Sequence, residues 1–519
     1  MAKAWFRQSL ILAFFYVSVV LVITNLLLAG ATLSAQDYQS DEAHMMRTDL
    51  FGTARSLGAG GAFSTVGADM TSMSSNPAGI ALYRSHEIAI SAGGIWGNTN
   101  TSYLGQSTSA NFAKGTFSQA GLILTTKRLS NYTDLSYNRG GSRLDRVVFG
   151  FGYQKLADFN RTDYFTGANA HNSYAAALAS ELNTDLTAAV NPNNFSIPAV
   201  NGYNAGIFNF PDSTLTAYPR IGLPINQIGQ ITTQGAMSEL NFTLGFNIGN
   251  TVYIGAGVGV PYLSYKRYAT FTEYNNGGDS TYTSTYNYQL SGWGVNGKLG
   301  IIVKPVQWLR FGAAVQSPTY YRLHESDYGY TSSQLGDSAY GGENSLSYQF
   351  TYNNPLKGTF GASFYLKQWG FISVDYEIND YSHTHFAFDG NDRSISDGIN
   401  TNISNTYKLA STVKAGAEFA YKSLRLRAGF AWSESPFKNS KAPSGYDGAR
   451  FNYTAGIGYR GRSFFADLAY VRTMYKDYYT PYAYTDASGN LQSPGVYNSF
   501  SSNMIVATIG FKFGLNRNQ

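Results

Sequence analysis

The feature that most constrains this chain is an alternation of apolar and polar residues at every second position. Within residues 238–248 the apolar positions are Leu240, Phe242, Leu244, Phe246 and Ile248. A strand sends successive side chains to opposite faces, whereas a helix would mix the two sets, so this segment is predicted to be a β-strand. Residues 356–366 and 505–513 repeat the pattern. The second face carries Glu239 and small polar residues, which indicates that it meets water.

The composition suits strands that have one face in lipid. Charged residues are 13% of the chain, against roughly 25% in ordinary soluble domains. The chain has 55 Gly, 41 Tyr and 33 Phe. A transmembrane β-barrel accounts for both observations, because each strand shows one face to lipid and the other to the lumen. A secreted, soluble β-sandwich is the alternative, but charges would crowd its outer face.

The first residues predict export. Lys3 and Arg7 precede an apolar run over residues 10–28, and small residues follow up to Ala35. This order is typical of a secretory signal peptide over residues 1–35, cleaved after Ala31 or Ala35, with an uncleaved anchor as the alternative. We therefore expect a barrel in the cell outer membrane, reached through the periplasm.

Short and long connections alternate along the rest of the chain. Long polar connections are expected near residues 157–235, 266–284, 324–350, 379–404, 433–449 and 476–499. Barrels with short periplasmic turns and long extracellular loops show this order. Counting strands gives an all-β, antiparallel barrel of about 14 strands over residues 87–513, preceded by an N-terminal hatch, or plug, at 36–86 and followed by a tail at 514–519. The connection at 128–143 is long although it falls on the short side.

One segment of the first long connection has helical periodicity. Tyr174, Leu178 and Leu182 are spaced four residues apart, and the same spacing continues to Val190. This stripe predicts an amphipathic helix. The helix either packs on its own loop or offers an apolar, ligand-binding lip at the extracellular mouth.

The sequence resembles the FadL/TodX family of outer-membrane transporters for long-chain fatty acids and other hydrophobic compounds. The resemblance is carried by a Gly-rich stretch at 56–67, by Asn76-Pro77-Ala78, and by a first strand at 86–96. It continues through residues 148–152, 240–247, 299–312 and 372–377. It implies a fourteen-stranded barrel with a hatch, ligand capture at extracellular loops, hatch movement and lateral release at an inward kink of the third strand.

The resemblance also implies a gating role for one turn of the hatch, made of Asn76, Pro77, Ala78 and Gly79. Pro77 fixes its own φ and restricts the residue before it, and an Asn side chain is suited to bonding nearby backbone in a turn. The alternative is a simple turn that leads into the first strand.

The third strand contains two glycines, Gly150 and Gly152. Glycine inside a strand weakens the ladder and often marks a bulge or bend. We place any gap just beyond these residues, near Lys155, Asp158 and Phe159. An ordinary Gly-rich strand is the alternative.

A fatty carboxylate needs a cation where an apolar pocket meets a polar lining. Lys266 and Arg267 near the mouth, and Arg310 on the lumen side of the seventh strand, are the candidates. The alternative is that all three are ordinary lumen or rim charges.

Several function classes find no support. The chain has no cysteine, so it has neither disulfides nor cysteine metal sites. Its net charge of +5 comes without a basic run, which argues against nucleic acid. His383 and His385 could share a strand face, but no carboxylate motif joins them as metal ligands. The Gly-rich run at 255–259 is followed by no helix to hold a phosphate.

We therefore expect neither an enzyme nor a cofactor or metal site. The leading hypothesis is a monomeric transporter of a hydrophobic small molecule, such as a fatty acid, in contact with outer-membrane lipid. A general diffusion porin and a surface adhesin-type barrel are the alternatives.

Overall fold

The computed structural model describes residues 47–126, 144–187, 196–210, 216–336, 338–388, 393–438, 442–485 and 491–514. The predicted signal peptide, the turn at 128–143 and Val190 lie outside these ranges. No helix within them is long and apolar enough to cross a membrane.

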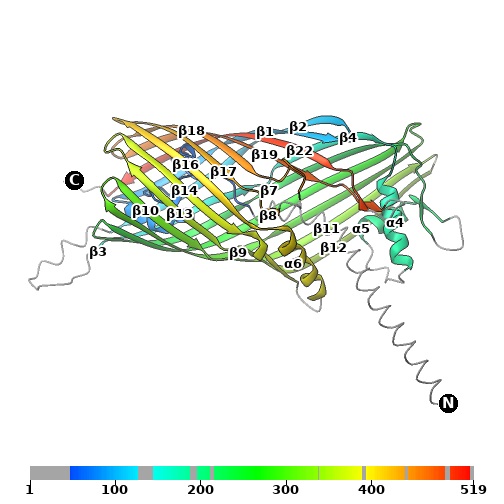
Figure 1. The fold of residues 1–519 in the computed structure, drawn as a ribbon, viewed down its shortest axis with the longest axis horizontal. Coiled ribbons are helices and arrows are strands. Elements are labelled where there is room, and N and C mark those ends of the chain that lie inside the picture. Colours follow the sequence, from blue (N-terminus) through cyan, green and yellow to red (C-terminus); the bar gives the residue numbers. More distant parts are fainter. Residues whose placement is uncertain are drawn as a thin grey trace, which may run out of the picture.

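The wall is a closed antiparallel barrel of 14 strands, as predicted (Figure 1). Ten strands are continuous: β1 (His86–Tyr103), β2 (Gln106–Thr125), β7 (Ile225–Ile248), β8 (Val252–Asn275), β9 (Ser280–Val306), β16 (Leu409–Tyr421), β17 (Leu424–Ser433), β18 (Arg450–Arg460), β19 (Phe464–Tyr479) and β22 (Val496–Phe513). The barrel closes where β1 pairs with β22, from His86↔Phe513 to Ser102↔Tyr497.

The other four wall strands are each interrupted and consist of two parts. They are β3 (Leu144–Asp158) with β4 (Arg161–Asn169), β10 (Leu309–Gln316) with β11 (Thr319–Leu335), β12 (Ser338–Asn354) with β13 (Lys357–Tyr365), and β14 (Gly370–Asp380) with β15 (His385–Phe388). Two short pairs lie outside the wall: β5 (Phe208–Asn209) with β6 (Tyr218–Pro219), and β20 (Tyr484–Thr485) with β21 (Leu491–Gln492).

The predicted alternation appears in β7 as two distinct faces. Phe242 and Leu244 are exposed on the outside, while Glu239, Asn241 and Thr243 are buried in the lumen. Large apolar side chains cover the outside of the other strands too. Trp308 and Trp369 stand beside short turns at one border of this apolar band. The neighbouring rings of Tyr262 and Trp293, tilted by 46° to each other, stand farther along the strands. An apolar band between aromatic borders is the surface by which a barrel spans a membrane.

Several strands continue well beyond this band. A tilted strand crosses a bilayer with about 9–11 residues, but β8 has 24 and β9 has 27. The prediction of a long loop is therefore wrong at two places. Residues 266–284 are mostly strand, and residues 324–350 belong mainly to the β11–β12 hairpin. These strands are polar because no lipid faces them, and their many Thr and Tyr residues favour strand structure nevertheless.

Residues 47–85 fill the lumen as the predicted hatch. They include α2 (Ala54–Gly58), α3 (Ser72–Ser75) and the 3₁₀ helix η1 (Pro77–Leu82). The α2 helix packs on β17–β19, whereas η1 packs on β7–β9, so the hatch touches opposite walls. Its apolar side chains are buried, among them Leu57, Phe63, Met73 and Ile80.

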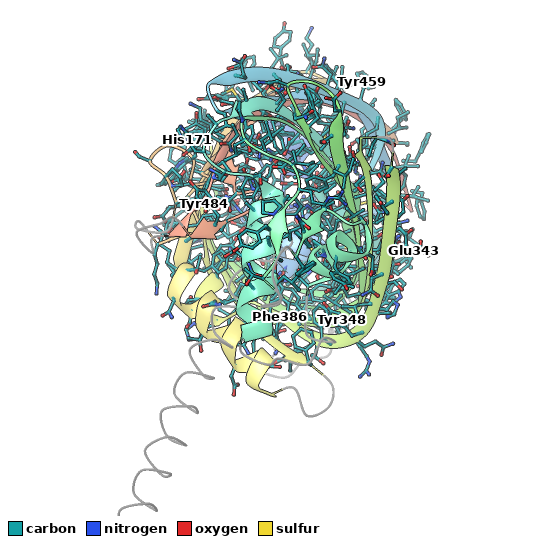
Figure 2. The ribbon with its side chains drawn as sticks, turned by 90° about the vertical axis from the view of Figure 1, so that its right-hand side faces the viewer. His171, Glu343, Tyr348, Phe386, Tyr459 and Tyr484 are labelled. Atoms are coloured by element: carbon teal, nitrogen blue, oxygen red, sulfur yellow. The ribbon has the colours of Figure 1, made fainter. Side chains whose placement is uncertain are left out.

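Helices cover the end of the barrel that carries the long strands. They are α4 (Tyr174–Thr187), α5 (Ile197–Asn204), the short η4 (Tyr381–His383) and α6 (Arg393–Thr406). Figure 2 views the barrel from this end and shows helices lying across its mouth. The Ser173 hydroxyl accepts a hydrogen bond from Ala176 N at 2.9 Å, and the Glu273 carboxylate accepts from Tyr174 N at 2.6 Å. These bonds satisfy amides that the first turn of α4 leaves without helical partners.

Candidate functional site

The wall is interrupted between β2 and the third strand. The ladder joining β2 to β3 runs only from Thr125↔Val148 to Gln119↔Gln154. Beyond it, residues 106–117 of β2 pair with β1, and β4 pairs with β7. Main-chain groups inside a membrane must be paired unless they face protein or a water-lined cavity. The break is therefore expected to border an internal space.

The third strand bends at the break. Its ladder with β7 shifts register between Lys155 and Ala157, which leaves a bulge. Just beyond the bulge, Gly235 of β7 has φ 118°, and its carbonyl accepts a hydrogen bond from Phe159 N at 3.1 Å. A bulge bends its strand and increases the local twist. The bend thus lies at Lys155 to Phe159, the segment in which the sequence places any gap.

Gly150 and Gly152 lie below the bend, in regular ladder. A Cβ on Gly152 would lie 2.5 Å from Met73 Cε, and one on Gly150 would lie 2.8 Å from Met73 Sδ. These two glycines therefore make room for a hatch side chain and do not form the bend.

Side chains bridge the break in place of the missing ladder. Lys114 of β2 lies 2.6 Å from the Asp158 carboxylate. Lys155 donates to Asp158 at 3.0 Å and to the Thr116 hydroxyl at 3.1 Å. The hatch joins the same point, since Asp158 N donates to the Asp49 carboxylate at 2.9 Å. Lys155 and Asp158, both marked from the sequence, are thus brought together, whereas Lys114 carried no signal because its partner is distant along the chain.

Beside the break lies a cavity of about 200 Å³. Its lining combines the first described hatch residues, the bend and the inner faces of several strands. Aromatic residues of the lining include Phe51, Phe112, Phe159, Tyr265 and Phe500. Cationic residues of the lining are Arg47, Arg161, Arg267, Lys414 and Arg450. The cavity is therefore amphipathic.

The arginines of the cavity are held in place by acids and rings. Arg161 lies 2.5 Å from Asp477, and its guanidinium is 5.8 Å from the centre of the Tyr475 ring. Arg450 lies 4.8 Å from the centre of the same ring and forms an ion pair with Asp49. Tyr475 thus lies between two cations, at a place where positive charge meets aromatic carbon.

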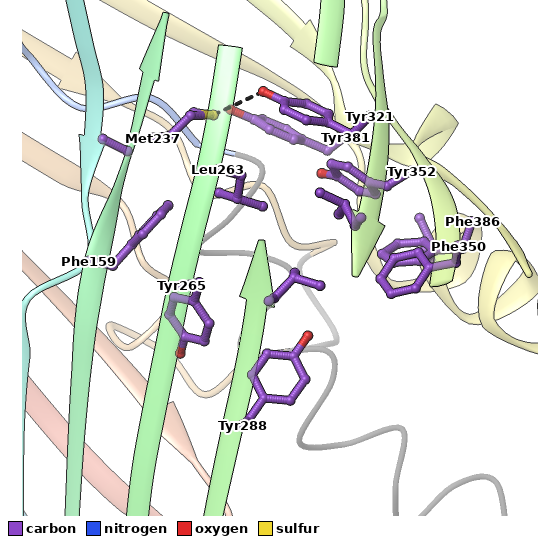
Figure 3. Close-up of a cluster of buried hydrophobic side chains, with 14 of the residues drawn as sticks. Phe159, Met237, Leu263, Tyr265, Tyr288, Tyr321, Phe350, Tyr352, Tyr381 and Phe386 are labelled. Carbon is purple, nitrogen blue, oxygen red and sulfur yellow. Dashed lines mark hydrogen bonds between the residues drawn. The ribbon is translucent and has the colours of Figure 1, made fainter. Parts of the chain in front are cut away.

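An apolar tract leads from the bend along the lumen wall (Figure 3). Phe159 packs edge-on against Tyr265 with ring centres 5.4 Å apart. From there the buried tract continues through Met237, Leu263, Tyr288, Leu290, Tyr321, Leu323, Phe350, Tyr352, Tyr381 and Phe386. The alternation does not predict this tract, because the polar second face of the strands indicates a wet lumen. Its only local signal is apolar residues on the lumen face of β8, β9 and β11.

The three candidate cations have different surroundings. Arg267 lines the cavity, whereas Lys266, the next residue of the strand, points to the opposite face. Arg310 donates to the hatch carbonyl of Val66 at 2.7 Å and lies 4.3 Å from the centre of the Tyr365 ring. The structure therefore brings Arg267 to the cavity and sets Arg310 against the hatch.

The α4 stripe is turned inward. Leu178 and Leu182 are each 4% exposed and belong to a core that includes Ile207 and Phe208 of the same long connection. Tyr174 packs against Phe271 with ring centres 5.3 Å apart. This arrangement is the one in which the helix packs on its own loop.

The marked hatch turn is fully enclosed. The Asn76 side-chain oxygen accepts from Ala78 N at 3.1 Å, and its amide donates to Ser64 O at 2.8 Å. Pro77 begins η1, where a missing N–H costs nothing. Asn76 thereby caps η1 and ties it to an earlier hatch segment.

Within the described residues, no group of three or more His, Cys, Asp or Glu side chains could hold a metal ion.

The fold and this site define a transmembrane β-barrel that is closed by a hatch and interrupted at its third strand. The chain is similar to the crystal structure of a Pseudomonas aeruginosa FadL homologue, with a TM-score of 0.54 and 12% identity over 90% of this chain and 99% of that one.

Two other solved structures are similar at lower scores. The Pseudomonas putida toluene transporter TodX has a TM-score of 0.49 and 13% identity over 90% of this chain and 100% of its own. The CymD monoaromatic hydrocarbon channel has a TM-score of 0.47 and 12% identity over 89% and 97%. No protein-family model and no curated protein matches the sequence. The similarity to the FadL homologue confirms the FadL-type fold that the sequence predicts.

Proposed function

We propose that this protein is an outer-membrane channel for the uptake of hydrophobic small molecules. The observation that carries the proposal is the buried apolar tract that leads along the lumen wall to a break in that wall. A diffusion porin for polar solutes has no use for such a tract, because apolar walls hold no hydrated solute. A surface adhesin would need neither the tract nor the break.

The cavity beside the break is the proposed binding site. An apolar cavity of about 150 Å³ can hold benzene, so about 200 Å³ admits a small aromatic compound or one end of a longer chain. The aromatic lining would cover the apolar part of the ligand. Arg267 and Arg450 belong to the lining, and a guanidinium pairs well with a carboxylate, which makes a fatty acid a suitable ligand.

The break between β2 and the third strand is the proposed exit. A hydrophobic molecule gains little by entering the periplasm but can leave sideways into the membrane. Lys114 and Asp158 bridge the opening, and Asp49 connects it to the hatch. Movement of the hatch segment that carries Asp49 would thus alter the cavity and the exit together.

We also propose that the protein acts as a monomer surrounded by outer-membrane lipid.

A binding measurement with matched variants tests the proposal. Purified barrel would be titrated with a fluorescent fatty acid and, in competition, with toluene. Burial of one large apolar side chain is worth about 1.5–3 kcal/mol, so Phe159→Asp should weaken binding at least tenfold, while Phe159→Leu should retain most of it. Equal affinity of the two variants, or passage of small sugars through the reconstituted protein, would favour the porin instead.

A further inference from the structure

Adjacent wall strands present glycine to the hatch on their lumen faces. Gly245 of β7 pairs with Gly255 of β8, which pairs in turn with Gly300 of β9. We call these three residues the glycine seat. None of them has a positive φ, so the backbone conformation does not require glycine. Glycine weakens a strand, and it often marks a place where another backbone approaches closely.

Any side chain at the glycine seat would collide with the hatch. A Cβ on Gly255 would lie 2.2 Å from the carbonyl carbon of Pro77 and 2.3 Å from Ala78 N. A Cβ on Gly300 would lie 2.0 Å from the Asn76 side-chain oxygen. The main chain of the hatch turn therefore lies directly on the main chain of the wall at Gly255.

The same crowding continues on further strands. A Cβ on Gly416 would lie 2.1 Å from Ala59 O, and one on Gly429 would lie 2.2 Å from Gly60 N. A glycine on the outer face behaves differently. Gly297, on β9 like Gly300, would place a Cβ no nearer than 3.9 Å to any atom. The lack of space thus belongs to the side that faces the hatch.

We propose that Gly255 and Gly300 are positioning residues for the hatch, and that their lack of side chains sets how closely the Asn76–Gly79 turn seals the wall. Contact of main chain with main chain leaves no gap for a file of water or ions along this side of the lumen. The inference relies on the proposed function only in treating the hatch as the part that closes the channel. The contact itself holds whichever ligand is carried.

Four single variants and two double variants test this inference in the full-length protein. Gly300→Ala and Gly255→Ala are compared with Gly297→Ala as the matched outer-face control, and Asn76→Ala is measured alone. Asn76→Ala is then combined with each of the two inner-face variants. Ion conductance in planar bilayers reports the seal, and heat-modifiable gel mobility reports barrel assembly.

Gly300→Ala and Gly255→Ala should each raise conductance several-fold, whereas Gly297→Ala should not. Asn76→Ala removes the atom that collides at residue 300, so the Gly300 double variant should conduct less than the two single changes predict together. Asn76→Ala should not lower the conductance of the Gly255 double variant in this way, because the atoms that a Cβ at residue 255 would meet belong to the hatch main chain. Should either inner-face variant fail to assemble, Asn76→Ala is expected to restore assembly of Gly300→Ala and not of Gly255→Ala.

Three results would overturn the proposal. They are normal conductance in assembled Gly300→Ala, an equal effect of Gly297→Ala, and rescue by Asn76→Ala at both positions or at neither. These readouts do not depend on ligand transport, so they stand apart from a failure of the proposed function.

Discussion

The Lys114 ammonium lies 2.6 Å from the Asp158 carboxylate across a stretch where β2 and the third strand have no ladder between their described residues. The contact replaces a rigid main-chain connection with side chains that can move. Lys155 shares the same carboxylate at 3.0 Å. This arrangement suits the proposed sideways exit, because few bonds would need to break for the wall to open there.

Loss of this contact should loosen the break. Lys114→Met keeps the length of the side chain but removes its charge, while Lys155 still neutralises Asp158. We therefore expect the free energy that holds the two strands together at the break to fall by about 1 kcal/mol, as for partly exposed ion pairs. A fluorescent fatty acid should then be released into liposomes at a higher rate. Hydrogen exchange at residues 112–118 should accelerate. Lys304→Met, near a short turn, is the control, and equal exchange and release in both variants would mean that the pair does not hold the break.

A double substitution in α4 should damage the helical cap, which consists of α4 and α5 at the end of the barrel that carries the long strands. Leu178 and Leu182 are buried, and each contributes about 1.5–3 kcal/mol through burial of its side chain. Leu178→Asp with Leu182→Asp should therefore expose residues 174–204 to limited proteolysis. Ser180→Asp, on the exposed side of the same helix, should stay resistant. If both proteins are cut equally slowly, the stripe is not the core of the cap.

The contrast between β7 and α4 shows what the sequence can determine. Phe242 and Leu244 face lipid while Glu239 faces the lumen, and a local alternation is enough to predict such a strand. Leu178 and Leu182 show equally clear helical spacing, but spacing alone does not tell which partner covers the stripe. The partners, Ile207 and Phe208, come from a later part of the same connection.

The site was predicted less completely than the fold for the same reason. The sequence marks Lys155 and Asp158 as candidates because it predicts a bend on their own strand. Lys114 joins them through pairing between strands, which no local pattern encodes. The sequence predicts a loop at the polar hairpin of β11 and β12, because strands beyond the membrane lose the lipid-facing residues that reveal alternation.

The helical cap should be sensitive to pH through Glu273. This carboxyl lies on β8 well beyond the aromatic border at Tyr262, and it accepts hydrogen bonds from the α4 amides and from Gln227. Burial raises the pKa of Glu273 from 4.5 to about 7. A raised carboxyl pKa in the folded state means that its contribution to stability is full below pH 4.5 and is lost as pH rises through about 7.

Protection of the α4 amides from hydrogen exchange should accordingly fall between pH 4.5 and about 7, once corrected for intrinsic exchange. Glu273→Gln keeps a side chain of the same shape without the titration, so its protection should not vary over this interval. A wild-type profile that matches the variant would show that Glu273 does not control the cap.

Asn76→Ala should impair the hatch without preventing barrel assembly. The substitution removes the cap of η1 and the bond to Ser64 O. Loss of such a cap typically costs about 1 kcal/mol. Uptake of a hydrophobic substrate should fall while heat-modifiable mobility remains normal. Normal uptake by the assembled variant would mean that the motif is only a turn.

Photo-crosslinking tests the central claim, sideways release, most directly. A fatty acid with a photoreactive group at its tail would be bound to the reconstituted barrel, irradiated, and mapped by mass spectrometry. Release through the break predicts adducts at cavity residues such as Phe112 and Phe159 and on the outer face of β2 near Phe117. Adducts that instead run through hatch residues 54–82 toward the short turns, with none on β2, would contradict it.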